Sequence, residues 1–280
     1  LVWFEVNAPK GQWAAVSLTK KQRWKRIMAS HEREELLEGR NPVLEALKAG
    51  RNIKKVIIAT EAHGQQIKEI EAYVRDQAIP LVYWDKKELD RLSTTHKHQG
   101  VLASVEPLTT VLVDDLLATA RFKGENPLLL LLDGVEDPHN LGSIIRTAEV
   151  AGAHGVILPE RRTAGLNATV LKASAGAANY LPVARVKNTV RGVEELKTKG
   201  CWVIGADQDG SNLWTEPFDL TLPLCLVLGG EGKGLSRLAR EKCDLILQIP
   251  MQGQVSSLNV SVATGILVYE VLRRRTQSAE

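Results

Sequence analysis

The spacing of apolar positions changes along the chain, and it predicts two α/β regions of unequal size. From Glu38 onward, short β-branched runs alternate with segments whose apolar residues recur at helical spacing. In the first region these patterns predict strands at 54–59, 80–84 and 101–105, and helices at 43–49, 67–77 and 86–92. Gly39 and Pro42 form a turn signal before the first helix, because proline is well tolerated at a first helical position.

The second region continues the alternation with longer apolar runs. It predicts strands at 128–132, 155–158, 181–186, 202–206, 224–228 and 244–249, and helices at 141–151, 168–173, 190–199, 235–241 and 258–274. Nearly continuous apolar strands between helices indicate a parallel sheet that is covered on both faces. A polar cluster at 123–127 marks a boundary. We expect a small α/β domain at 36–106, a linker at 107–126 and a parallel-sheet domain at 127–280.

Residues 1–27 follow neither pattern. They contain three tryptophans and a basic cluster at 20–26, but no clear period and no signal-peptide cleavage pattern. Met28 precedes the first segment that looks like a domain. We expect residues 1–30 to be a disordered extension, with 1–27 an addition or a start-site artefact; the alternative is a basic arm that binds RNA.

Composition adds few constraints. The 280 residues carry a formal net charge of +3 and a pI near 8.7, which is compatible with an RNA partner without requiring one. No apolar run reaches the roughly 20 residues that cross a bilayer, so no membrane association is expected. The cysteines, Cys201, Cys225 and Cys243, are widely spaced and form no C-x-x-C pair, which favours reduced thiols in a cytoplasmic protein. Neither they nor the six histidines have metal-ligand spacing.

Three loops that follow predicted strands concentrate the polar and glycine residues. They span 133–142, 229–234 and 249–260. The glycine loop is not a P-loop, because Lys233 is followed by Gly234 rather than by Ser or Thr. It also lacks the position and the acidic partner of a dinucleotide-binding fingerprint. In a parallel sheet such loops meet at the carboxyl edge, where ligands bind.

Taken together, the three loops resemble the three motifs of the SpoU (TrmH) family of RNA 2′-O-ribose methyltransferases, which belong to the SPOUT superfamily. The motifs are Asn140-x-Gly142-x-x-x-Arg146, the run 228–234, and Ile249–Pro250–Met251 with 255–263. The resemblance extends over about 38–275 and includes His98–Gln99–Gly100. Within the family, the pattern is most similar to the bacterial enzymes that methylate a guanosine ribose in 23S ribosomal RNA.

The resemblance implies a trefoil-knotted parallel-sheet domain that binds S-adenosylmethionine, and a homodimer with the last helix and the region of Arg146 near its interface. It implies that the small domain resembles an RNA-binding ribosomal-protein fold. Backbone contacts to the cofactor are assigned to Gly229, Ile249 and Leu258. Contacts to the ribose and phosphate are assigned to Asn140, Arg146, Glu231, Ser257 and Asn259.

The chemistry of ribose methylation agrees with these residue types. The ribose hydroxyl must lose a proton while it attacks the sulfonium methyl group, and near-attack positioning supplies much of the acceleration. Arg146 suits a phosphate beside that hydroxyl because a guanidinium binds phosphate through two parallel hydrogen bonds. A direct role of Arg146 in removing the proton needs strong activation, because an arginine normally stays protonated. Glu231 and Asn259 are candidates to orient the nucleophile and the ribose.

Each candidate has a simpler structural alternative. Arg146 could lie on a helix surface, Asn140 could cap a helix that starts at Leu141, and Glu231 could close a capping arrangement. Ser257 and Asn259 could only begin the last helix. His139 fits a solvated loop position, and His98 a structural or RNA-contacting one.

Two competing functions also remain. One is a non-catalytic protein that binds ribosomal RNA, and the other is a ribose methyltransferase that acts on transfer RNA or confers resistance through ribosomal RNA. An intact set of Arg146, Glu231 and Asn259 argues against the first.

Overall fold

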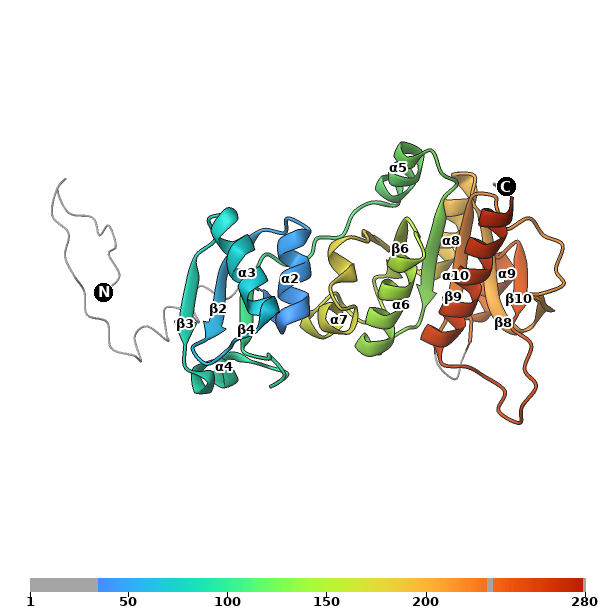
Figure 1. The fold of residues 1–280 in the computed structure, drawn as a ribbon. Helices are drawn as coiled ribbons and strands as arrows, with labels where there is room; N and C mark the ends of the chain where they lie inside the picture. The colour runs from blue at the N-terminus through green and yellow to red at the C-terminus, as the bar shows by residue number, and fades with distance from the viewer. Residues whose placement is uncertain (1–34, 231–233, 279–280) are drawn as a thin grey trace.

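A computed structural model describes residues 35–230 and 234–278 of the chain, and Figure 1 shows two α/β units along it. The expectations for residues 1–30 therefore lie outside the described residues. The first unit contains β1 (Glu35–Glu38), α2 (Arg40–Lys48), β2 (Ile53–Ala59), α3 (Gln65–Asp76), β3 (Leu81–Trp84), α4 (Lys86–Leu92) and β4 (Val101–Val105).

The sheet of the small unit has the strand order β1-β4-β2-β3. β2 and β3 run parallel, whereas β4 is antiparallel to both β1 and β2. The sequence pattern did not predict β1, because the segment ELLE has charged ends and no β-branched residue. Pairing with β4 determines its conformation: Leu37 lies opposite Ala103, and both are buried.

The larger unit adds α5 (Val113–Lys123), β5 (Leu128–Asp133), α6 (Pro138–Val150), β6 (Gly155–Pro159), α7 (Ala168–Ala173), β7 (Val183–Val186), α8 (Thr189–Thr198), β8 (Trp202–Asn212), β9 (Leu224–Gly229), α9 (Arg237–Lys242), β10 (Leu245–Gln248) and α10 (Val260–Gln277). Its six strands are all parallel, in the order β10-β8-β9-β5-β6-β7. The prediction of a parallel sheet is confirmed. The trefoil knot implied by the family resemblance stays a prediction.

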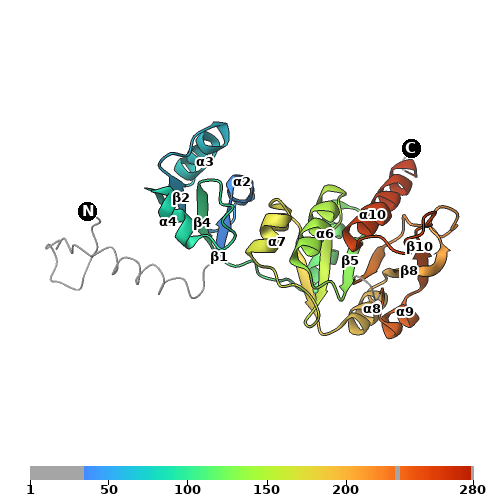
Figure 2. The same ribbon diagram turned by 90° about the horizontal axis from the view of Figure 1, so that it is seen from below.

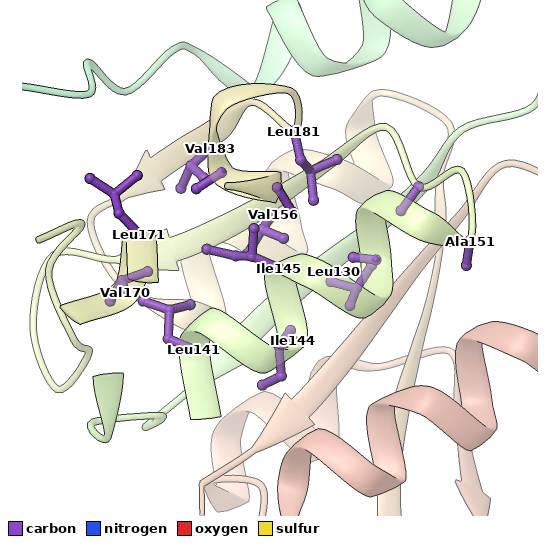
Figure 3. Packing of buried hydrophobic residues seen from close by; sticks show 14 of the residues in the cluster. Leu130, Leu141, Ile144, Ile145, Ala151, Val156, Val170, Leu171, Leu181 and Val183 are labelled. Carbon is purple, nitrogen blue, oxygen red and sulfur yellow. The ribbon is translucent and has the colours of Figure 1, made fainter. Parts of the chain in front are cut away.

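Helices cover both faces of this sheet. In Figure 2, α6, α7 and α10 lie on one side and α8 and α9 on the other. Figure 3 shows Leu141 of α6 beside Val170 of α7, and Ile145 near Val156 of β6. α6 and α7 approach so closely that a Cβ on Gly142 would lie 2.4 Å from the Cβ of Ala173. The glycine of the first motif is therefore required by helix packing.

The segment 107–126, which the sequence pattern assigns to a linker, is largely part of the larger unit. Leu116 and Leu117 of α5 are buried in the same apolar cluster as residues of β5, β6 and α8. The amide of Val111 also donates to the carbonyl oxygen of Val183 at 2.9 Å. This burial places α5 with the sheet and shortens the connection to a few residues before it.

Side chains and close backbone contacts join the two units. The hydroxyl of Tyr180 donates to Glu45 Oε2 at 3.0 Å, and Arg51 donates to Asn179 Oδ1 at 3.3 Å. A Cβ on Gly176 would lie 2.4 Å from the Cβ of Glu45. These contacts hold α2 of the small unit against the segment that follows α7.

A buried carboxylate fixes the loop after α4. Glu38 is 3% exposed and accepts hydrogen bonds from Ser93, Thr94 and Thr95. Burial alone would raise the pKa of Glu38, but the bonds from Ser93, Thr95 and Thr94 outweigh it and lower that pKa from 4.5 to about 2. Lys172 of α7 binds the same loop from the larger unit, donating to Thr95 Oγ1 at 2.7 Å.

The unfolding free energy of the protein should depend on pH because of Glu38. A carboxyl whose pKa is lower in the folded chain stabilises it fully above the unfolded pKa. We expect that contribution to be lost as the pH falls from about 4.5 towards about 2. The difference in unfolding free energy between wild type and Glu38→Gln, measured in urea at several pH values, should shrink across this window. Parallel pH profiles for the two proteins would contradict the assignment.

None of the described helices is long and apolar enough to cross a lipid bilayer. Over residues 35–230 and 234–278, no group of three or more His, Cys, Asp or Glu side chains is placed to hold a metal ion.

Candidate active site

The three motif loops meet at the carboxyl edge of the larger sheet. β5 and β9 are neighbours, and their last residues, Asp133 and Gly229, lie opposite each other in register. β10 ends at Gln248 on the sheet edge, two strands away from β9. From there the chain crosses the ends of the intervening strands to reach α6, where Asn259 contacts Asn140. The motif loops thus lie at the edge of a parallel sheet where ligands bind.

Asp133 fixes the glycine loop to the end of β5. One carboxylate oxygen accepts from the hydroxyl of Thr189 at 2.6 Å, and the other accepts from the amide of Ser236 at 2.9 Å. Its carbonyl oxygen accepts from the amide of Gly230 at 2.8 Å. Sequence reasoning assigned no role to this residue. The available signal was an acidic side chain at the end of an otherwise apolar strand.

The described ends of the glycine loop, Gly229–Gly230 and Gly234, are tightly packed. A Cβ on Gly229 would lie 2.1 Å from the carbonyl carbon of Gly234, and one on Gly230 would lie 2.1 Å from the carbonyl oxygen of Gly134. The amide of Gly234 donates back to the oxygen of Gly230 at 3.2 Å. Backbone thus contacts backbone at both positions, which only glycine permits. Glu231, a predicted catalytic residue, lies outside the described residues.

A direct hydrogen bond joins the first and third motifs. Asn259 Nδ2 donates to Asn140 Oδ1 at 3.0 Å, and Asn140 is 8% exposed. The simpler alternative, in which Asn140 caps a helix that starts at Leu141, is wrong, because the helix begins at Pro138 and Asp137 is its N-cap, accepting from the amide of His139. Asn259 does cap α10: its side-chain oxygen accepts from the amide of Ser261 at 2.9 Å.

Replacing Asn259 should separate these two roles. Asn259→Ala removes both the cap and the bond to Asn140, whereas Asn259→Ser keeps a capping oxygen and loses only the reach to Asn140. We expect the alanine variant to lose about 0.5–2 kcal/mol of stability. Both variants should lose much of the methyl-transfer rate. Chemical denaturation and turnover, measured on the same preparations, check this; a serine variant with normal turnover would reduce Asn259 to a helix cap.

Arg146 lies apart from the asparagine pair. It is exposed, about two turns further along α6, and points from a different face of the helix. It lines a hollow of about 380 Å³ with Glu149, Tyr180 and Glu45 of the small unit. Within the described part of the chain, its side chain has no ion pair or hydrogen bond. A single chain therefore holds the predicted ribose-binding residues in two separate places.

The remaining predicted residues occupy the connection between β10 and α10. Ile249 is partly buried against the main apolar core, whereas Ser257 and Leu258 are exposed, Leu258 to 37%. Exposed backbone beside an exposed leucine offers hydrogen-bonding groups and an apolar contact to an adenosine group. The cofactor role of Gly229, Ile249 and Leu258 stays a prediction.

The two noted histidines have different environments. His98 is 3% exposed; its Nδ1 accepts from the amide of Gly100 at 3.0 Å, and its Nε2 lies 2.9 Å from Asp90 Oδ1. This arrangement supports a structural role for His98. His139 is exposed on the first turn of α6, as a solvated loop position predicts.

Comparisons with known proteins agree with this arrangement. Residues 127–269 match the sequence model of the SpoU rRNA Methylase family, and residues 36–111 match that of the RNA 2′-O ribose methyltransferase substrate-binding domain. A Bacillus subtilis protein assigned to the TrmH family of tRNA/rRNA methyltransferases is 46% identical over 242 residues, covering 86% of this chain and 96% of the relative. A Staphylococcus aureus relative with the same family assignment is 42% identical over 245 residues, covering 88% of this chain and 98% of the relative.

Solved structures extend the likeness to the fold. The SpoU methyltransferase AviRb from Streptomyces viridochromogenes, in complex with its cofactor AdoMet, has a TM-score of 0.74 at 26% identity, covering 92% of this chain and 94% of its own. The AdoMet-bound rRNA methyltransferase from Sinorhizobium meliloti has a TM-score of 0.71 at 28% identity, covering 91% and 90%. With both of its units matched and its motif loops at one sheet edge, the chain belongs to the SpoU (TrmH) family of RNA 2′-O-ribose methyltransferases.

Proposed function

We propose that this protein methylates the ribose 2′-hydroxyl of a guanosine in 23S ribosomal RNA. The observation that supports catalysis most directly is the Asn140–Asn259 bond, which brings the first and third family motifs together beside the packed glycine loop. A purely RNA-binding protein would not need this pairing of two amide side chains at the carboxyl edge of the sheet. The Bacillus subtilis and Staphylococcus aureus relatives carry names that cover tRNA and rRNA alike, so transfer RNA is the second candidate substrate.

The methyl donor is S-adenosylmethionine, which supplies an electrophilic methyl group on a sulfonium sulfur. Backbone groups at Gly229, Ile249 and Leu258 would hold it. The paired asparagines would orient the ribose so that its hydroxyl faces that methyl group, and this fixed orientation lowers the barrier to attack. Arg146 would bind the adjacent phosphate through its planar guanidinium and favour the developing alkoxide.

Because one chain separates Arg146 from the asparagine pair, we propose that the active unit is a homodimer and that Arg146 acts on the partner's cofactor site. α10 supports a dimer through its two apolar stripes. Leu267 and Val271 are buried within the chain, whereas Val262 and Tyr269 are 51% and 48% exposed. An exposed apolar stripe beside a buried one is typical of a surface that a second subunit covers.

Light scattering at micromolar concentration should give a dimer mass, and Val262→Lys should shift it towards the monomer. Complementation then tests the shared site. A mixture of Arg146→Ala and Asn259→Ala subunits should regain turnover that neither variant has alone, because one mixed site keeps both residues. A clean monomer mass for the wild type, or no recovery in the mixture, would contradict a shared site.

Mapping 2′-O-methyl groups on total RNA from a deletion strain tests the substrate. Loss of one ribose methyl group in 23S ribosomal RNA is the expected result. Loss from a transfer RNA instead would select the second candidate, and no loss from either RNA would favour a non-catalytic role. The compartment proposed is the cytoplasm, since Cys201, Cys225 and Cys243 form no disulfide with one another.

A further inference from the structure

A polar hollow of about 680 Å³ lies within the small unit, away from the methylase motifs. It sits where the parallel strands β2 and β3 end and where β4 begins. Its volume falls in the range of ligand pockets in proteins. The residues that line it are Arg40, Ala59, Glu61, Ala62, Gln66, Lys86, Asp90, His96, His98, Gln99 and Gly100.

One wall of the hollow is an irregular loop in a costly backbone conformation. His96 and Gln99 both have φ of 52°, a left-handed value that non-glycine residues rarely adopt, and Gly100 follows with φ of 81°. Such conformations persist where surrounding contacts enforce them, and they concentrate at binding sites. The loop therefore presents His96 and the Gln99 backbone in a fixed orientation.

Contacts from three sides enforce this loop. Arg40 donates from Nε to the oxygen of Gln99 at 3.0 Å and from a terminal nitrogen to the oxygen of His63 at 3.1 Å, across the mouth of the hollow. His98 anchors the loop from beneath through Asp90 and Gly100. From the methylase unit, Lys172 donates to the carbonyl oxygen of Lys97 at 3.0 Å.

The charges of the hollow fit a nucleotide better than an isolated phosphate. Arg40 and Lys86 are cationic, but the carboxylates of Glu61 and Asp90 line the same space and would repel a purely anionic ligand. Carboxylates and amides instead accept hydrogen bonds from the N–H groups of a base edge. Histidine rings and arginine planes are surfaces on which proteins stack unpaired RNA bases.

We infer that this hollow binds one unpaired nucleotide of the substrate RNA, with its base against His96 and its phosphate near Lys86. The inference rests on the proposed function, since it assumes that RNA is the substrate. It adds a specific site to the matched substrate-binding domain. The bond from Lys172 joins the loop to α7, and α7 packs on Gly142, two residues from Asn140. The hollow and the methylation edge are thus linked through directly packed elements.

The test measures RNA affinity of the full-length protein with two probes, an unmodified 23S ribosomal RNA transcript and unmodified transfer RNA. His96→Asn removes the ring but tolerates the left-handed backbone. Lys86→Ala removes one cation, and Lys68→Ala is the matched control, an exposed lysine of α3 that does not line the hollow. Thermal unfolding and S-adenosylmethionine affinity are measured on the same preparations and should not change.

For the substrate RNA, His96→Asn should weaken binding about tenfold without changing its salt dependence, because the lost contact is a stacked base. Lys86→Ala should weaken binding several-fold and lower the slope of log affinity against log salt by about one. Lys68→Ala should bind normally and keep its kcat at saturating RNA. Wild-type affinity in His96→Asn and Lys86→Ala, or equal losses in Lys86→Ala and Lys68→Ala, would overturn the inference. A wild type that binds RNA but transfers no methyl group counts against the proposed function, and the affinity comparison still decides the inference.

Discussion

Arg146→Ala should abolish methyl transfer while leaving the affinity for S-adenosylmethionine within a few-fold of normal. The residues assigned to the cofactor lie in the glycine loop and after β10, whereas Arg146 projects from α6 into a different hollow. Loss of a cation that binds phosphate and stabilises developing negative charge should cost at least two orders of magnitude in turnover. Tritiated methyl transfer to unmodified RNA, with calorimetry of the cofactor on the same preparation, measures both quantities.

Two further variants sharpen this test. Arg146→Lys should also fail substantially, because a point charge cannot reproduce a two-pronged contact with phosphate. Arg237→Ala is the matched control, since this arginine of α9 is 85% exposed and pairs only with Glu241 of its own helix in the described structure. Near-normal turnover in Arg146→Ala would remove Arg146 from the site. Lost cofactor binding would instead place it in the cofactor pocket or at the dimer contact.

Gly229→Val should destabilise the protein as well as abolish cofactor binding. The motif resemblance predicts only that a side chain here would intrude on the ligand. The structure adds a stronger reason, because even a Cβ would lie 2.1 Å from Gly234 and 2.5 Å from the amide nitrogen of Leu235. Backbone atoms cannot move aside as a flexible side chain can. We therefore expect the free energy of unfolding to fall by about 1–3 kcal/mol or more. Urea denaturation and cofactor calorimetry measure the two effects.

Gly253→Ala is the control for Gly229. It lies in the exposed connection before α10, and a Cβ there would meet nothing within 4 Å. This variant should keep wild-type stability. A Gly229→Val protein with normal stability and normal cofactor affinity would show that the loop rearranges freely, contrary to its packing.

The elements that the sequence predicted well are those whose burial is uniform. The apolar run at Leu128–Asp133 reads as a strand because both of its faces are covered. β1 was missed for the opposite reason, because β4, a strand distant in sequence, stabilises it. A short acidic helix is predictable within 111–126, but its burial against the larger sheet is not. The outer part of β8, up to Asn212, was missed because it pairs with β10 across an irregular register.

In the candidate site, too, the sequence predicted the features that depend on local pattern and missed those that depend on distant partners. Motif spacing placed the loops at one edge, since strand order and direction decide where loops meet. It could not reveal that Asp137, rather than Asn140, caps α6, because that depends on where the helix begins. The separation of Arg146 from Asn140 depends on the same helix start, because a six-residue spacing places two side chains on different faces only when both belong to the helix. The role of Asp133 appears only when its three partners are in place.

The close contact between Gly176 and Glu45 has a consequence for target selection. Together with the bonds of Tyr180 and Lys172, it sets a constant span between the small unit and the methylation edge. Substrate choice then depends on distance, because the RNA must present its anchoring nucleotide and its target ribose at one fixed separation in space. Folded RNA that offers the correct nucleotide at another separation should be a poor substrate, whatever its local sequence.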